Sequence, residues 1–221
     1  AAYSAVDREF EPHWHSHAGA VIDGVPASTD GEYAPANLIA QTMTQRATPA
    51  GGGGLSGLLG VPDGTLVWAM GSTTYQPNLG LGAEELDPSE WTGDVTLRFN
   101  PGASILPGAF GLFTTNIRGT NVVDRLFSSV APGATDFANT LPLSPGGHSH
   151  YQWAFTLPGL YRLSFTWEGT HVTDGFTSTS AVFAFQAGAA AVPEIDPSGL
   201  AGVLAIVTGG LGLLERRRRV A

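Results

Sequence analysis

The chain has 221 residues, of which 43% are hydrophobic and 13% charged, and its formal net charge is −9. It contains no cysteine, which excludes disulfides, thiolate metal sites and cysteine nucleophiles, so any metal must be held by His, Asp or Glu. Residues 1–191 carry six arginines against sixteen acidic residues, a net charge of −10 that argues against nucleic acid or anionic membrane as a partner.

The first residues of the chain are small, and a cluster of histidines follows them. Ala1-Ala2 is what a mature protein shows after a signal peptide is removed at a small-residue site, so we expect export. His13, His15 and His17 stand at alternate positions. In a strand, residues two apart face the same side about 6.5 to 7 Å apart, so their imidazoles can converge on one ion. This spacing indicates a candidate metal site, the alternative being a disordered terminal segment.

Two segments show little periodicity. Residues 48–60 contain four consecutive glycines, Gly51 to Gly54, and are predicted to be a flexible loop. Residues 83–91, with Asp87-Pro88-Ser89 inside them, are predicted to form a short helical turn.

Short segments of alternating hydrophobicity dominate residues 65–185. Apolar residues at 161, 163, 165 and 167 alternate with polar ones, which is typical of a half-buried strand. On this basis strands are predicted at residues 65–70, 95–99, 109–114, 121–127, 151–156, 161–167 and 181–185. Pro158-Gly159 predicts a tight hairpin turn between two of them. The expected fold is all-β, an antiparallel β-sandwich formed by residues 1–187 as one domain.

A second histidine pair, His148 and His150, has the same spacing just before a predicted strand. Two such pairs on adjacent strands would supply three or four nitrogen ligands, enough for zinc. We therefore predict a site in which His148 and His150 are joined by at least one N-terminal histidine. The alternative is that His148 and His150 are polar loop residues. The remaining histidine, His171, is predicted to be a hydrogen-bonded structural residue.

Enzymatic interpretations fit the sequence less well. Residues 147–151 begin like a G-x-S-x-G nucleophile elbow, but Tyr151 stands in place of its final glycine. A cupin also places His-x-His on a β scaffold, yet its usual glutamate a few residues further on is replaced by the apolar run Trp153 to Phe155. We predict that the protein is not an enzyme, a metal-dependent cupin-like enzyme being the less favoured alternative.

The region around the second pair resembles the choice-of-anchor M domain, a bacterial surface domain that occurs with different anchoring tails. The resemblance rests on the pattern His-x-His-x-x-Trp-x-Phe-x-x-Pro-Gly-x-Tyr, found here at His148, His150, Trp153, Phe155, Pro158, Gly159 and Tyr161. Residues 15–24, 66–68, 78–86 and 93–99 also resemble that family, so the likeness covers most of residues 13–187. The chain has Ser16-His17-Ala18-Gly19 where the family favours Gly-His-x-Asp. Actinobacterial relatives resemble partners of metal-uptake transporters, which favours the metal hypothesis.

The C-terminal thirty residues follow a small-residue linker at 188–191. An apolar run predicts a helix over residues 198–214, which would span roughly 25 Å and could just cross a membrane. A basic cluster follows it, consisting of Arg216, Arg217, Arg218 and Arg219. Such a cluster stays on the cytoplasmic side, so everything N-terminal to the helix is expected outside.

The order of Val192-Pro193-Glu194, the short apolar helix and the arginine cluster resembles the PEP-CTERM sorting signal of Gram-negative bacteria. Ile195 stands where that family usually has a second proline. The resemblance implies that an exosortase cuts near Pro193-Glu194 and passes the protein toward the cell surface or the extracellular polymer matrix. The alternative for residues 192–221 is a plain single-pass anchor.

These features together predict an exported surface protein of a Gram-negative-type bacterium, whose domain binds a divalent transition metal such as zinc. The expected partners are an exosortase, the inner membrane through the C-terminal helix before processing, and the polymer matrix or a metal-uptake system. The main alternative is a purely structural or adhesive matrix protein that binds no metal.

Overall fold

The structure is a computed structural model that describes residues 1–50, 54–72, 74–115, 122–130 and 139–189. The chain divides into two compact units, Ala1–Ala190 and Ala191–Ala221. All described elements belong to the first unit. Within the described residues, no helix is long and apolar enough to cross a membrane. The predicted sorting signal at 192–221, including the helix at 198–214, lies outside the described residues.

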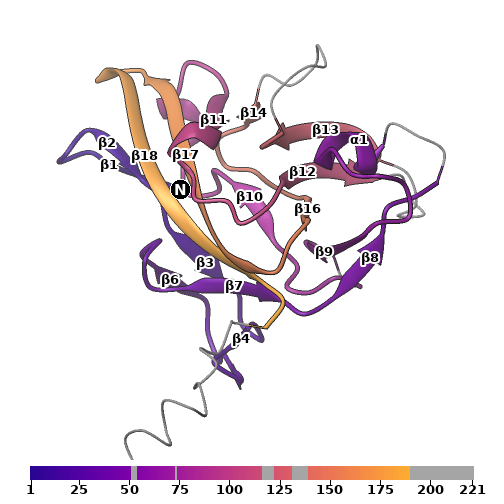
Figure 1. Cartoon of the computed structure of the whole chain (residues 1–221). Helices are drawn as coiled ribbons and strands as arrows, with labels where there is room; N and C mark the ends of the chain where they lie inside the picture. The colour runs from indigo at the N-terminus through magenta and orange to yellow at the C-terminus, as the bar shows by residue number, and fades with distance from the viewer. Residues whose placement is uncertain (51–53, 73, 116–121, 131–138, 190–221) are drawn as a thin grey trace, which may run out of the picture. The chain divides into compact units, whose positions relative to one another are not determined.

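Two five-stranded sheets form most of the first unit (Figure 1). The first sheet has the order β14 (Thr140–Leu143), β11 (Val95–Phe99), β17 (Gly159–His171), β18 (Gly175–Ala187) and β7 (Ile39–Thr42). The second has the order β13 (Val122–Ser128), β12 (Phe110–Thr115), β16 (Gln152–Phe155), β9 (Leu66–Met70) and β8 (Gln45–Ala47). Neighbouring strands are antiparallel except β7, which pairs parallel with β18. The all-β prediction is confirmed.

The two sheets share one aromatic core, as a sandwich-like arrangement requires. The alternating residues of β17, namely Tyr161, Leu163, Phe165 and Trp167, are all buried. Contacts between rings join the two sheets. The ring centroids of Trp153 on β16 and Phe185 on β18 lie 4.9 Å apart, and those of Phe99 on β11 and Phe110 on β12 lie 5.1 Å apart.

Residues 48–60 are not wholly a loop, because a short helix, α1 (Leu55–Leu59), lies within them. Leu55, Leu58 and Leu59 are buried and form a second apolar cluster with residues of β9, β12 and β16. Their i, i+3, i+4 spacing places them on one helix face, which covers the outer side of the second sheet. The sequence analysis predicted a loop here because of the four consecutive glycines, and so missed the apolar helix face that follows them.

The predicted hairpin turn at Pro158-Gly159 is wrong. The strand before it, β16, belongs to the second sheet, and the strand after it, β17, belongs to the first. Phe155 and Tyr161 both point into the core, where their ring centroids lie 4.6 Å apart. The chain therefore crosses between the sheets at this point, and the two rings meet across the core instead of lying on paired neighbouring strands.

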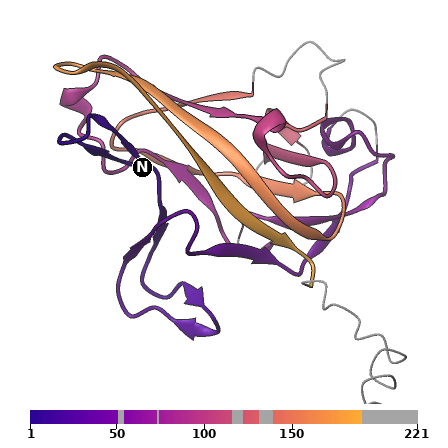
Figure 2. The same ribbon diagram turned by 60° about the vertical axis from the view of Figure 1, so that its left-hand side comes forward.

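Small two-stranded sheets and short turns complete the unit. They are β1 (Ala2–Ser4) with β2 (Glu9–Glu11), β3 (Trp14–Ser16) with β6 (Gly31–Tyr33), β4 (Val21–Ile22) with β5 (Val25–Pro26), and β10 (Gly80–Gly82) with β15 (His148–His150). The 3-10 turns are η1 (Pro88–Glu90), which confirms the predicted helical turn, and η2 (Pro101–Ala103). Figure 2 shows one N-terminal hairpin near the tip of the long β17–β18 ribbon and the following N-terminal strands extending away from that ribbon.

Candidate metal site

A cavity of about 160 Å³ brings together the histidines singled out in the sequence. All five, His13, His15, His17, His148 and His150, line it, together with Glu84 and Glu85. Its other lining residues include core aromatics, namely Trp153, Phe165, Trp167, Phe183 and Phe185. The cavity therefore combines nitrogen and carboxylate donors with an apolar wall.

Trp14 holds the first histidine cluster in place. Its ring packs against Phe183 and Phe185 at centroid distances of 5.0 and 5.4 Å, and its Nε1–H donates to the Pro35 carbonyl oxygen at 3.3 Å. Because successive side chains of a strand point to opposite faces, anchoring Trp14 turns His13 and His15 to the other face. One large aromatic residue between two histidines therefore fixes the direction in which both histidine side chains point.

Glu85 lies between two of these imidazoles. Its Oε1 atom is 3.1 Å from His13 Nε2 and 3.5 Å from His15 Nδ1. The other ring nitrogen of His13, Nδ1, is 2.9 Å from the Glu11 carbonyl oxygen. One carboxylate oxygen is therefore shared by two histidines, and one of these rings is oriented by the backbone.

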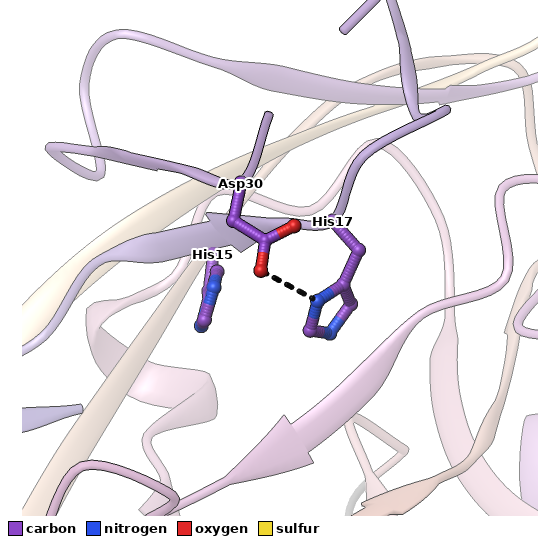
Figure 3. Close-up of side chains that lie close together, drawn as sticks. All are labelled: His15, His17 and Asp30. Atoms are coloured by element: carbon purple, nitrogen blue, oxygen red, sulfur yellow. Dashed lines mark ion pairs between the residues drawn. The ribbon is translucent and has the colours of Figure 1, made fainter. Parts of the chain in front are cut away.

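Asp30 makes the corresponding contact with His17, as Figure 3 shows. Its Oδ2 atom lies 3.7 Å from His17 Nδ1, and its Oδ1 accepts a hydrogen bond of 2.7 Å from the Ala18 backbone N–H. That N–H and the nearby histidines stabilise the carboxylate and lower the pKa of Asp30. The side chain is therefore charged at neutral pH and available as a ligand.

The second histidine pair lies on β15, which pairs antiparallel with β10. Gly82 is opposite His148, and a Cβ added at Gly82 would lie 2.7 Å from the His148 Cβ, so the close pairing requires glycine there. The ring centroids of His148 and His150 are 5.4 Å apart, and His148 Nδ1 lies 3.3 Å from Glu84 Oε2. Consecutive glutamates, Glu84 and Glu85, thus contact different histidine clusters.

The sequence analysis predicted that the two His-x-His segments lie on adjacent strands, and this prediction is wrong. β3 pairs with β6, and β15 pairs with β10. Each segment reaches the cavity from its own small sheet. The segments meet at one cavity without sharing a ladder of backbone hydrogen bonds.

Two groups of donors lie close enough to hold an ion. Among the described residues, ligand atoms within 4.8 Å of one another occur in His15, His17 and Asp30, and in His13, Glu32 and Glu85. His148 and His150 line the same cavity but belong to neither group. The close donor groups therefore contain the N-terminal histidines and not His148 and His150, which the sequence analysis placed at the centre of the site.

The carboxylates of this site were missed from the sequence. Glu32 lies on β6 directly opposite His15, Asp30 lies just before that strand, and Glu84-Glu85 follow β10. None has a metal-ligand spacing from a histidine along the chain. Only the juxtaposed acidic pair at 84–85, next to a Leu-Gly-Leu-Gly run, could have drawn attention.

His171 lies apart from the cavity and forms a different set of contacts. It is buried, stacks on Tyr3 at 4.7 Å, and its Nδ1 is 3.1 Å from Asp174 Oδ2. Tyr3 also donates its hydroxyl hydrogen to Asp174 at 2.9 Å. These contacts fix the first strand to the β17–β18 turn, which agrees with a structural role.

No protein-family model, curated protein or solved structure matches the chain.

Proposed function

We propose that this chain is an exported bacterial surface protein whose sandwich-like domain binds a divalent transition metal, zinc or a similar ion, in the histidine-lined cavity. The observation that carries the proposal is the convergence of three distant segments, residues 13–17, 84–85 and 148–150, on that one cavity. Their side chains offer five imidazoles and two carboxylates.

The donor types favour a transition metal over other ligands. Imidazole suits zinc, copper, iron and nickel, whereas calcium and magnesium prefer oxygen donors alone. The histidines are also not needed to fill the core, since His15, His17, His148 and His150 are exposed while the aromatic residues beneath them are buried. A set of exposed histidines gathered around shared carboxylates fits binding better than packing.

Zinc binding tests this proposal directly. The 221-residue chain, purified in mild detergent and stripped with chelator, should bind zinc in calorimetric titration at neutral pH and unfold at a higher temperature when loaded. Magnesium serves as the control metal and should produce neither effect. If zinc also produced neither effect, the metal proposal would fail and the structural or adhesive matrix protein would take its place.

The proposed location follows from the tail and the charge of the chain. We infer that Arg216 to Arg219 resist translocation and stop the chain with its C-terminus inside, after which an exosortase releases the rest near Pro193-Glu194. The ten excess negative charges of residues 1–191 fit a domain kept away from anionic membrane. A polymer matrix or a metal-uptake system is the proposed partner outside.

Intact mass spectrometry of the surface form checks the sorting part. Processing should yield a species that ends near Glu194 and lacks the arginines. Deleting Arg216 to Arg219 should misplace the protein while the thermal unfolding of residues 1–187 stays unchanged. A surface species that still carries residues 216–221 would contradict cleavage and favour a retained anchor.

A further inference from the structure

The orientation of His13 leaves a place for a proton or a metal ion between its ring and Glu85. A carbonyl oxygen only accepts hydrogen bonds, so His13 Nδ1, 2.9 Å from the Glu11 carbonyl, must carry the ring hydrogen. In the neutral ring Nε2 then presents a lone pair. This lone pair faces a carboxylate oxygen of Glu85 at 3.1 Å. Two acceptors at that distance require a proton or a metal ion between them.

The same orientation is the one that metal-binding histidines adopt. A ligating imidazole usually donates its other N–H to a backbone carbonyl or a carboxylate, which fixes the ring and directs the lone pair at the metal. The side chain of His13 is only 10% exposed, and that of Glu85 is 27% exposed. Glu32 completes this group within 4.8 Å. His13, Glu32 and Glu85 are named here the inner set.

A second, separate donor set combines two histidines of the N-terminal cluster with one aspartate. His15, His17 and Asp30 gather their ligand atoms within 4.8 Å, and Figure 3 shows the Asp30 carboxylate directed between the two imidazoles. The side chains of His17 and Asp30 are 63% and 60% exposed. These three residues are named here the outer set. Two histidines and one carboxylate leave coordination positions open to water or to another ligand.

The spacing of the rings divides the cluster between the two sets. The His15 and His17 ring centroids are 4.8 Å apart, whereas those of His13 and His15 are 6.4 Å apart. No residue belongs to both sets. Zinc takes four ligands in tetrahedral geometry, so one ion cannot be bound by all six residues.

We propose that the cavity holds two metal ions, one on the inner set and one on the outer set, with Glu85 between them. This inference rests on the proposed metal-binding function and adds its stoichiometry and its ligands. Four carboxylates, Asp30, Glu32, Glu84 and Glu85, would offset the four positive charges of two divalent ions. The inner ion is the less exposed of the two, and the outer ion can exchange with solvent.

The number of zinc ions per chain tests this proposal. Elemental analysis of the zinc-loaded 221-residue chain after removal of free metal should give two equivalents, and calorimetry should resolve two affinities. One equivalent would overturn the two-ion inference and leave the metal-binding function standing. Zero equivalents would overturn both.

Single isosteric variants assign each ion to its set. Asp30→Asn keeps an acceptor for the Ala18 N–H but removes the ligand charge, so the outer affinity should fall at least tenfold and one zinc should remain. Glu85→Gln should weaken the inner affinity by a similar factor. Glu168→Gln is the matched control, since Glu168 pairs with Arg98 and neither lines the cavity nor belongs to either set, and it should retain two equivalents. Retention of both wild-type affinities in Asp30→Asn or in Glu85→Gln would overturn the assignment.

Discussion

Phe165→Ala is expected to lower the free energy of unfolding by about 3 to 5 kcal/mol, through lost burial and the cavity that it leaves. Phe165 is 2% exposed on β17 and contacts aromatic residues of both sheets. Its ring lies 5.6 Å from Phe99 in its own sheet, and 5.9 and 6.3 Å from Phe127 and Trp153 in the other. Chemical denaturation followed by tryptophan fluorescence measures the effect, because all five tryptophans lie in the described unit.

The neighbouring residue provides the control for this experiment. Thr166 points to the outer face of β17, where its hydroxyl contacts Asn100 and Ser180 at 2.8 and 2.7 Å. Thr166→Ala loses these partly exposed hydrogen bonds and should cost about 1 kcal/mol. Equal effects of the two substitutions would contradict the inward orientation of Phe165. They would also contradict the packing of the two sheets against each other across the core.

The strands of the core could be predicted because their hydrophobic period is strong. β11 occupies the predicted residues 95–99, and β17 contains the predicted 161–167. The small N-terminal sheets were not predicted, since strands of two or three residues show too few alternations to detect. The crossover at Pro158-Gly159 was also missed, because a proline-glycine turn has the same sequence whether the next strand pairs beside the last or faces it across the core.

The candidate site could be predicted only in its nitrogen donors. The i, i+2 spacing of histidines is a local property, so five residues that line the cavity were found from the sequence. The carboxylates come from tertiary register instead. Glu32 lies near the cluster because β6 pairs with β3 at that residue, whereas Glu85 follows β10 and contacts His13 and His15 without any strand pairing between β10 and β3. No spacing along the chain encodes either contact.

Removing the N-terminal histidines should abolish stoichiometric zinc binding. The triple variant His13→Ala, His15→Ala, His17→Ala takes away every nitrogen donor of the two close donor groups. Trp14, which anchors this strand on Phe183 and Phe185, is left in place, so the strand should keep its position. Calorimetric titration with zinc measures the loss, and circular dichroism checks that the fold persists.

The second histidine pair should contribute less. His148 and His150 line the cavity but lie outside both close donor groups, so the double variant His148→Ala, His150→Ala should lower zinc affinity about 10- to 100-fold, as loss of supporting residues around a metal does. This order of effects differs from the sequence prediction, in which His148 and His150 form the core of the site. If the double variant abolished binding while the triple variant kept it, the sequence prediction would be the better account.

His171→Ala separates a loss of ligands from a loss of stability. His171 is buried between Tyr3 and Asp174 and does not line the cavity, so replacing it should destabilise the fold while leaving the number of bound zinc ions unchanged. A triple variant that retains wild-type zinc affinity would contradict the proposed site. Loss of zinc from His171→Ala in a chain that is still folded would show that binding depends on overall stability instead of on the cavity histidines.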